Sequence, residues 1–450
     1  MIVVRKSKLE PFWVGARKDW KSRQAMKLPF LVSITPDELK THALLLGSTG
    51  SGKTTALVHL IAQCIGSGRS LIVFDFRGAL ANSAFQLACL RVPVEKIALL
   101  DLREKLPLVG FNPLAGAGDT YFRALSVIDA VAEESESWGV QLSETMRYAL
   151  LLLAAKGQPI TNLERVLYDS EYREGLLKDF NDEQLTGFWE RYGTLSKDRQ
   201  ATLAGPVMNK VSLLFATDGL RKLFSHPRPL DLAKHLNTPG SVLIISLAAD
   251  ELSGAGRMVG NIILNAIRRE IFARITIPEQ KRNPVQLIVD EFEHFDSSVF
   301  EDFLAEARQY RLALIVAHQT LTQTNPKFRS LVLNGVGVKM FFRTGREDGV
   351  LLSKDLTGDS KAIDFNNVRV GEAYLWKKEK GYEHVLVNAP LLRPSLVRTL
   401  ASFLVKDRMR REARAIFGVS PEPNKAGATP GPNSPKGPKP PKPTNLEDWL

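Results

Sequence analysis

The most regular feature of the sequence is a series of short, continuous apolar runs that are bounded by turn-forming residues. The runs are Ala43–Leu46, Leu71–Phe74, Ile97–Leu100, Val242–Ser246, Leu287–Val289, Leu312–Ala317 and Val338–Phe342. They do not alternate with polar residues, which is typical of strands buried on both faces of a parallel sheet. Helical patterns lie between them, at Ala56–Ile65, Ala79–Leu90, Gly256–Arg274 and Phe300–Arg308. We therefore predict a three-layer α/β core with a mostly parallel sheet.

One long interval interrupts this alternation. From residue 119 to residue 236 the sequence has no clear strand pattern and carries helical periodicity instead, punctuated by Gly157-Gln158-Pro159 and His226-Pro227. We predict an all-α domain over 119–236, inserted into a motor domain that comprises 41–118 and 237–400. Outside these domains we expect a basic segment over 1–40, a basic helix over 401–419 and a tail over 420–450.

The first apolar run leads directly into a glycine-rich phosphate-binding signature. The residues are Gly47, Ser48, Thr49, Gly50, Ser51, Gly52, Lys53, Thr54 and Thr55, followed by a helical pattern. In this setting backbone N–H groups surround a phosphate chain, Lys53 reaches the β- and γ-phosphates, and the Thr54 hydroxyl ligates Mg²⁺. Octets rich in Gly, Ser and Thr also occur as plain loops, but the strand before and the helix after favour a P-loop fold of the RecA-like class that binds ATP and Mg²⁺.

A second apolar run ends in two carboxylates, Asp290 and Glu291. In a P-loop enzyme, Asp290 is expected to hold Mg²⁺ through water, and Glu291 to orient or deprotonate the attacking water. Alone, such a pair is most often a solvated loop. The distance of more than 200 residues between the two motifs indicates ATP hydrolysis that drives motion rather than a small kinase.

Further candidates follow the next two apolar runs. Gln319 ends the run after Asp290–Glu291, and if the two strands are neighbours its amide can contact both the γ-phosphate and the attacking water. Arg308, on the predicted intervening helix, either has a structural role in its own subunit or reaches the ATP of the next subunit as an arginine finger. Arg343 and Arg346 compete for that role, although an arginine near a strand end is more often a surface residue.

The net charge of the chain indicates which class of partner it binds. The chain of 450 residues has a formal net charge of +11 and a pI of about 9.5. Lysine and arginine exceed the acids within 1–40 and again within 406–414. This excess favours a polyanion such as DNA, with a merely well-solvated surface as the alternative.

The last part of the sequence has a different composition. Residues 421–443 are rich in proline, glycine and lysine and have almost no apolar residues, so we expect them to be disordered or extended. Leu446-Glu447-Asp448-Trp449-Leu450 follows, which is either a frayed segment or a peptide that docks a protein partner.

The sequence also indicates a compartment. No apolar stretch approaches the roughly 20 residues that span a bilayer. No secretory signal is visible, and Cys64 and Cys89 are interpreted as buried free thiols. We expect a cytoplasmic protein without a transmembrane segment, associated at most peripherally with a membrane machine.

These segments together resemble the HerA/FtsK superfamily of ring-forming motor ATPases, and within it the DNA-coupling ATPases of type IV secretion and conjugation. The resemblance covers roughly residues 30–400 and rests on Gly47–Thr54, Asp75-Phe76-Arg77-Gly78, Asn112-Pro113-Leu114, Asp290-Glu291, Arg308 and Gln319. It implies a hexameric ring that pumps single- or double-stranded DNA through a central pore, with active sites between subunits. The alternatives are a helicase that acts with a nuclease in DNA processing or phage defence, and a protein-directed secretion or assembly ATPase.

Overall fold

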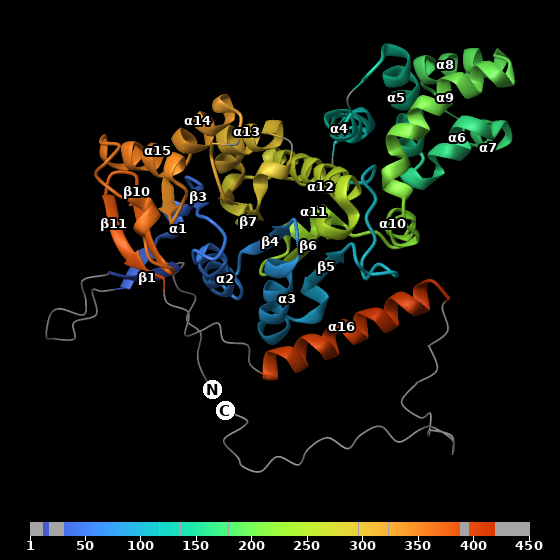
Figure 1. Ribbon diagram of the computed structural model, residues 1–450. Helices are drawn as coiled ribbons and strands as arrows, with labels where there is room; N and C mark the ends of the chain where they lie inside the picture. The colour runs from blue at the N-terminus through green and yellow to red at the C-terminus, as the bar shows by residue number, and fades with distance from the viewer. Residues whose placement is uncertain are drawn as a thin grey trace, which may run out of the picture.

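The structure is a computed structural model that describes residues 12–17, 31–116, 118–135, 137–178, 180–295, 297–322, 324–387 and 396–418. Within these residues one eleven-stranded sheet has the order β2-β1-β11-β10-β9-β3-β8-β7-β4-β6-β5 (Figure 1). The strands from β9 to β5 are parallel, whereas β10, β11, β1 and β2 pair antiparallel at one side. The predicted class, a mostly parallel α/β sheet, is confirmed.

The parallel strands coincide closely with the predicted apolar runs. They are β3 (Ala43–Leu46), β4 (Ser70–Asp75), β5 (Ile97–Asp101), β6 (Val242–Ser246), β7 (Val285–Asp290), β8 (Leu312–His318) and β9 (Val338–Phe341). The antiparallel strands are β1 (Phe12–Arg17), β2 (Leu31–Ile34), β10 (Glu372–Lys377) and β11 (Gly381–Leu386). The hydrophobic pattern did not predict this second group. β11 lacks a continuous apolar run, and the four apolar residues of β10 lie between Glu372 and Lys377.

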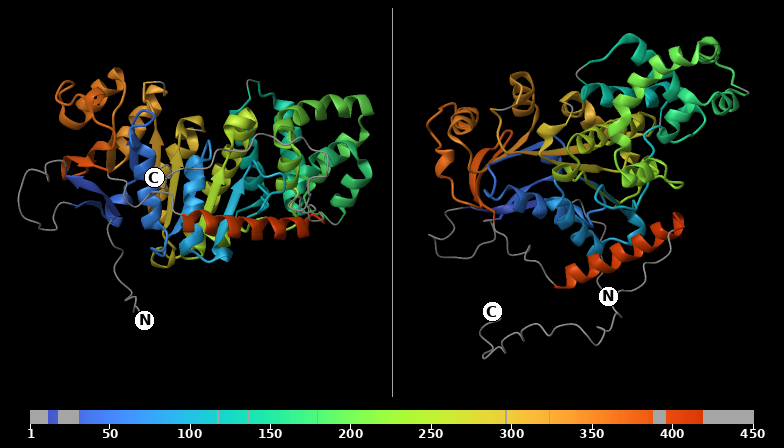
Figure 2. Two further views of the ribbon diagram at one scale, coloured as in Figure 1. Left: turned by 60° about the horizontal axis from the view of Figure 1, so that its bottom comes forward. Right: turned by 45° about the vertical axis from the view of Figure 1, so that its right-hand side comes forward.

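Helices cover both faces of the parallel strands. The helices of the sheet domain are α1 (Pro36–Leu39), α2 (Lys53–Cys64), α3 (Ala79–Arg91), α11 (Leu232–Asn237), α12 (Ala249–Phe272), α13 (Ser297–Glu306), α14 (Pro326–Gly335), α15 (Arg346–Thr357) and α16 (Leu396–Ile416). Alternate residues of each strand face two separate cores: Leu44 and Ile72 pack on the side of α12, and Leu45 and Val73 on the side of α2 and α3. Figure 2 shows this layering from two further directions.

Between β5 and β6 the regular structure of the described residues is helical. These helices are α4 (Thr120–Glu133), α5 (Val140–Ala155), α6 (Leu163–Tyr168), α7 (Ser170–Leu177), α8 (Glu183–Thr194), α9 (Lys197–Val211) and α10 (Asp218–Phe224). They lie to one side of the sheet, as the green helices of Figure 1 show. The predicted helical insertion is therefore confirmed, while its limits at residues 119 and 236 stay a prediction.

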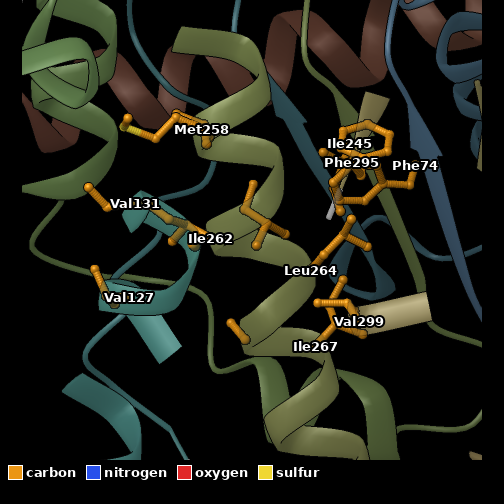
Figure 3. Close-up of a cluster of buried hydrophobic side chains, with 14 of the residues drawn as sticks. Phe74, Val127, Val131, Ile245, Met258, Ile262, Leu264, Ile267, Phe295 and Val299 are labelled. Carbon is orange, nitrogen blue, oxygen red and sulfur yellow. The ribbon is translucent and has the colours of Figure 1, made fainter. Parts of the chain in front are cut away.

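Helix α12 joins the insertion to the sheet. Ile262 and Met258 lie toward Val127 and Val131 of α4, whereas Leu264 lies on the side of the sheet core (Figure 3). The helix begins at Ala249, seven residues before its predicted start at Gly256. Gly256 lies within the helix and permits close packing, since a Cβ there would lie 3.0 Å from the Leu247 carbonyl oxygen.

The basic helix α16 packs along α3 and uses part of its charge internally. Lys406 and Arg410 both pair with Glu104, at 2.9 Å and 2.7 Å, and Lys406 also lies 3.3 Å from Asp101. These two cations hold the helix to the edge of the sheet domain. Less of the basic excess in 406–414 is therefore available to a polyanion than the sequence indicated.

The α12 interface predicts a stability difference between two isoleucines. Ile262→Ala removes a side chain that is 1% exposed and should lower the free energy of unfolding by about 2–5 kcal/mol. Ile275→Ala is the matched control, because Ile275 is 62% exposed and its truncation should cost less than about 0.5 kcal/mol. Urea unfolding of both variants measures the difference, and equal losses would contradict this packing.

Candidate nucleotide-binding site

The glycine-rich loop lies between β3 and α2, at the carboxyl edge of the parallel strands. Gly50 and Gly52 have φ angles of +74° and +111°, a left-handed conformation that favours glycine. The Ser48 backbone N–H and its hydroxyl both donate to the Arg343 carbonyl oxygen, at 2.8 Å and 3.0 Å. The loop is thereby fixed to the residue that follows β9.

The loop fits a phosphate chain. Helix α2 begins at Lys53 and has no side-chain cap at Gly52, so the first N–H groups of a 12-residue helix point out of its N-terminus. The Ser51 hydroxyl is buried and has no hydrogen-bond partner among the described residues. A Cβ at Gly52 would lie 3.1 Å from the Gly371 Cα, so the backbone approaches closely here. These donors suit the oxygen atoms of a nucleotide's phosphates.

The strand registers bring the acidic residues next to this loop. Asp290 ends β7 opposite Asp75 of β4 on one side and Ala317 of β8 on the other. Its Oδ1 lies 3.9 Å from the Lys53 Nζ. A carboxylate of this kind, beside a phosphate-binding loop, suits Mg²⁺, which prefers oxygen ligands.

Burial governs the protonation of this pair. It raises the pKa of Asp290 to about 6, with Asp75 and Glu291 adding to the rise and Lys53 opposing it. Burial also lowers the pKa of Lys53, against the attraction of Asp290. Loss of hydration therefore outweighs the mutual attraction at 3.9 Å, and both groups would gain from a bound magnesium–phosphate group.

Gln319 connects the loop to the second carboxylate. It follows β8, which lies between β3 and β7, so the neighbouring strands that its predicted role required are present. The Thr49 hydroxyl donates to Gln319 Oε1 at 3.0 Å, and Gln319 Nε2 donates to Glu291 Oε1 at 2.6 Å. Glu291 has a φ angle of +53°, which is unusual for a residue other than glycine and marks many functional sites.

Arg77 is a further residue of this cluster, to which sequence reasoning gave no role. It follows β4, and its Nε donates to Glu291 Oε2 at 2.9 Å. His294 Nε2 lies 3.9 Å from the same oxygen. The signal in the sequence was a basic residue shortly after Asp75. Its contact with Glu291 could not be predicted, because it depends on β4 and β7 being neighbouring strands.

The arginine-finger candidates lie at two opposite edges of the sheet, with Arg308 at the amino edge and Arg343 at the carboxyl edge. Arg308 lies on a 3-10 turn (Ala307–Tyr310) after α13 rather than on the predicted helix, because α13 ends at Glu306. It lines a groove with Val285 and Leu312, at the opposite, amino end of β7 and β8. Arg343 contacts the loop through its carbonyl oxygen, and Arg346 begins α15. Their side-chain roles stay predictions.

The chain is similar to type IV secretion coupling proteins in part of its sequence and to TrwB in its fold. A family described as the type IV secretion-system coupling protein DNA-binding domain matches residues 27–96. The unbound bacterial conjugative coupling protein TrwB lacking 70 N-terminal residues superposes with a TM-score of 0.57 at 15% identity, over 87% of this chain and 99% of that chain. This chain has the fold of TrwB.

Two liganded TrwB structures are equally similar. The complex with the ATP analogue ADPNP has a TM-score of 0.59 at 15% identity, over 86% of this chain and 97% of TrwB. The complex with ADP and Mg²⁺ has a TM-score of 0.57 at 15% identity, over 88% and 98%. No curated protein sequence matched the chain significantly. In the described part of the chain, no helix is both long and apolar enough to cross a membrane.

The raised pKa of Asp290 predicts pH-dependent nucleotide binding. Because Mg²⁺ requires the carboxylate, affinity for Mg²⁺ with a non-hydrolysable ATP analogue should weaken by up to about tenfold per pH unit below about pH 6. Calorimetric titrations at about four pH values between about 5 and 8 measure how this affinity changes with pH.

The nucleotide's phosphate also titrates near this range. Comparison of wild type with Asp290→Asn therefore separates the titration of Asp290 from that of the phosphate. That variant should bind more weakly at pH 8 and show a flatter pH dependence. Asp218→Asn, an exposed carboxylate in the helical insertion, should retain the wild-type slope. Identical slopes for wild type and Asp290→Asn would contradict the assignment.

Proposed function

We propose that this protein is an ATP-driven DNA translocase of the coupling-protein type, which acts as a hexameric ring. The proposal rests on the two hydrogen bonds of the Gln319 amide, one with Thr49 of the phosphate-binding loop and one with Glu291. An amide in that place can respond to the presence of a γ-phosphate and act on the carboxylate that we propose activates water. This is the arrangement that a motor ATPase requires, because hydrolysis must depend on an intact triphosphate.

Each residue of the site has a proposed role. Lys53 binds the β- and γ-phosphates, and Gly47 to Thr55 supply backbone and hydroxyl donors around the phosphate chain. Thr54 and Asp290 hold Mg²⁺, which when bound neutralises charge on the phosphates. Glu291 orients and deprotonates water, and Gln319 positions Glu291. Arg308, Arg343 and Arg346 compete for the role of a finger directed at a neighbouring subunit.

Two observations support DNA as the track. The family that matches residues 27–96 is described as a DNA-binding domain, and the chain has a net charge of +11. The fold is that of TrwB, described as a conjugative coupling protein. We place the motor in the cytoplasm, with 420–450, which lies outside the described residues, as the segment that docks a protein partner.

ATPase measurements with and without DNA test this proposal. We expect single-stranded or duplex DNA to raise the steady-state rate severalfold, and the effect to weaken from about 50 mM to about 200 mM salt as phosphate contacts are screened. A robust rate that ignores both forms of DNA at low salt would contradict the DNA part and favour a protein-directed ATPase.

Removing the charge of Glu291 separates binding from hydrolysis. Glu291→Gln should bind ATP with near wild-type affinity and lower the turnover number by about 10²–10⁴-fold, because the amide cannot accept the water's proton. Glu306→Gln is a matched control, since Glu306 is an exposed carboxylate at the amino edge of the sheet. Full turnover in Glu291→Gln would refute its role.

A further inference from the structure

In this structure both oxygen atoms of the Glu291 carboxylate are occupied. Oε1 accepts from Gln319 at 2.6 Å, and Oε2 accepts from the Arg77 guanidinium at 2.9 Å. The Glu291 side chain is only 10% exposed, whereas that of Arg77 is 63% exposed. A water molecule that approaches Glu291 must therefore compete with a cation that is itself open to solvent.

The backbone of Arg77 is held on two sides. Its N–H donates to Asp75 Oδ1 at 3.0 Å, and its carbonyl oxygen accepts from Arg103 Nη2 at 2.7 Å. The same Arg103 guanidinium pairs with Asp250 and Glu251, each at 2.7 Å. The position of Arg77 thus depends on the first turn of α12, which contains both acids.

Helix α12 continues this connection to the helical insertion. Asn261 donates to Glu134 at 3.1 Å, just after α4, and Arg257 lies 3.6 Å from the same carboxylate. Ala248, which precedes α12, has a φ angle of +49°, a conformation that costs free energy in a residue other than glycine. A packed, hydrogen-bonded route therefore links Glu291 through Arg77 and Arg103 to the insertion.

We propose that Arg77 is a positioning residue that restrains Glu291 until a competing anion takes its guanidinium. This inference rests on the proposed function, in which that anion is a phosphate of the DNA track. The high exposure of the guanidinium makes such an exchange possible, and the exchange frees Oε2 for water. Arg77 then couples the presence of DNA to hydrolysis, and Arg103 makes its position sensitive to movement of α12.

The test is the ATPase rate of Arg77→Ala in the full chain, with and without DNA. Loss of a partly exposed ion pair of this kind changes an equilibrium constant by a factor of about two to five. We expect the DNA-free rate to rise by about that factor and the fold-stimulation by DNA to shrink equally. Arg77→Lys, which keeps a cation, should restore part of the restraint.

Two controls show whether the effect passes through Glu291. Arg411→Ala removes an arginine that is 70% exposed and paired with Asp407 on α16, and should leave the DNA-free rate unchanged. Adding Arg77→Ala to Glu291→Gln should give no rise over Glu291→Gln alone, because the carboxylate that Arg77 restrains is then absent. A merely structural role of Arg77 would not produce this dependence.

The remaining outcomes overturn the proposal. A DNA-free rate that is unchanged or lower in Arg77→Ala shows that Arg77 does not restrain Glu291, and a large loss with KM unchanged would make it a transition-state contact instead. A rise that persists with Glu291→Gln places its effect elsewhere. If wild type hydrolyses no ATP, the proposed function fails and this inference with it, whereas an active wild type with an unraised Arg77→Ala refutes this inference alone.

Discussion

The site depends on the order of four parallel strands, β3-β8-β7-β4, whose carboxyl ends meet at one edge of the sheet. Neighbouring strands lie about 4.8 Å apart, so one side chain reaches only the next strand. Gln319 directly follows β8, the strand between β3 and β7, and contacts both the phosphate-binding loop and Glu291. Arg77 reaches Glu291 from the other side. Glu291 therefore has one partner from each of the two strands that neighbour β7.

Burial gives this edge its chemical character. Asp290 and Lys53 both lose hydration, and their attraction across 3.9 Å does not compensate, since the pKa of Asp290 rises while that of Lys53 falls. A site in this condition favours a ligand that brings both a cation and an anion. Arg77 differs because it is exposed and exchangeable, and its anchor on Arg103 extends to α12. The residues proposed to bind Mg²⁺ and phosphate are thus buried, whereas Arg77, which is proposed to control hydrolysis, is exposed to solvent.

Sequence patterns predicted the parallel core well, because strands buried on both faces appear as unbroken apolar runs, as in Val242–Ser246. They missed β10 and β11, which carry charges, and the first seven residues of α12. For the site, Lys53 and Asp290 were predictable because local motifs specify them. The Arg77–Glu291 contact was not, since residues 214 positions apart meet only through strand order. The position of Arg308 at the opposite edge was also not predictable, because it depends on how the whole sheet is assembled.

We propose that ATP hydrolysis at this site moves the protein along DNA. Displacement of streptavidin from biotin-ended DNA tests it directly, on single-stranded and duplex tracks in separate reactions. We expect ATP-dependent displacement by wild type on at least one track and none by Glu291→Gln, which should bind ATP but turn it over about 10²–10⁴-fold more slowly. Active ATP hydrolysis without displacement on either track would contradict a DNA motor.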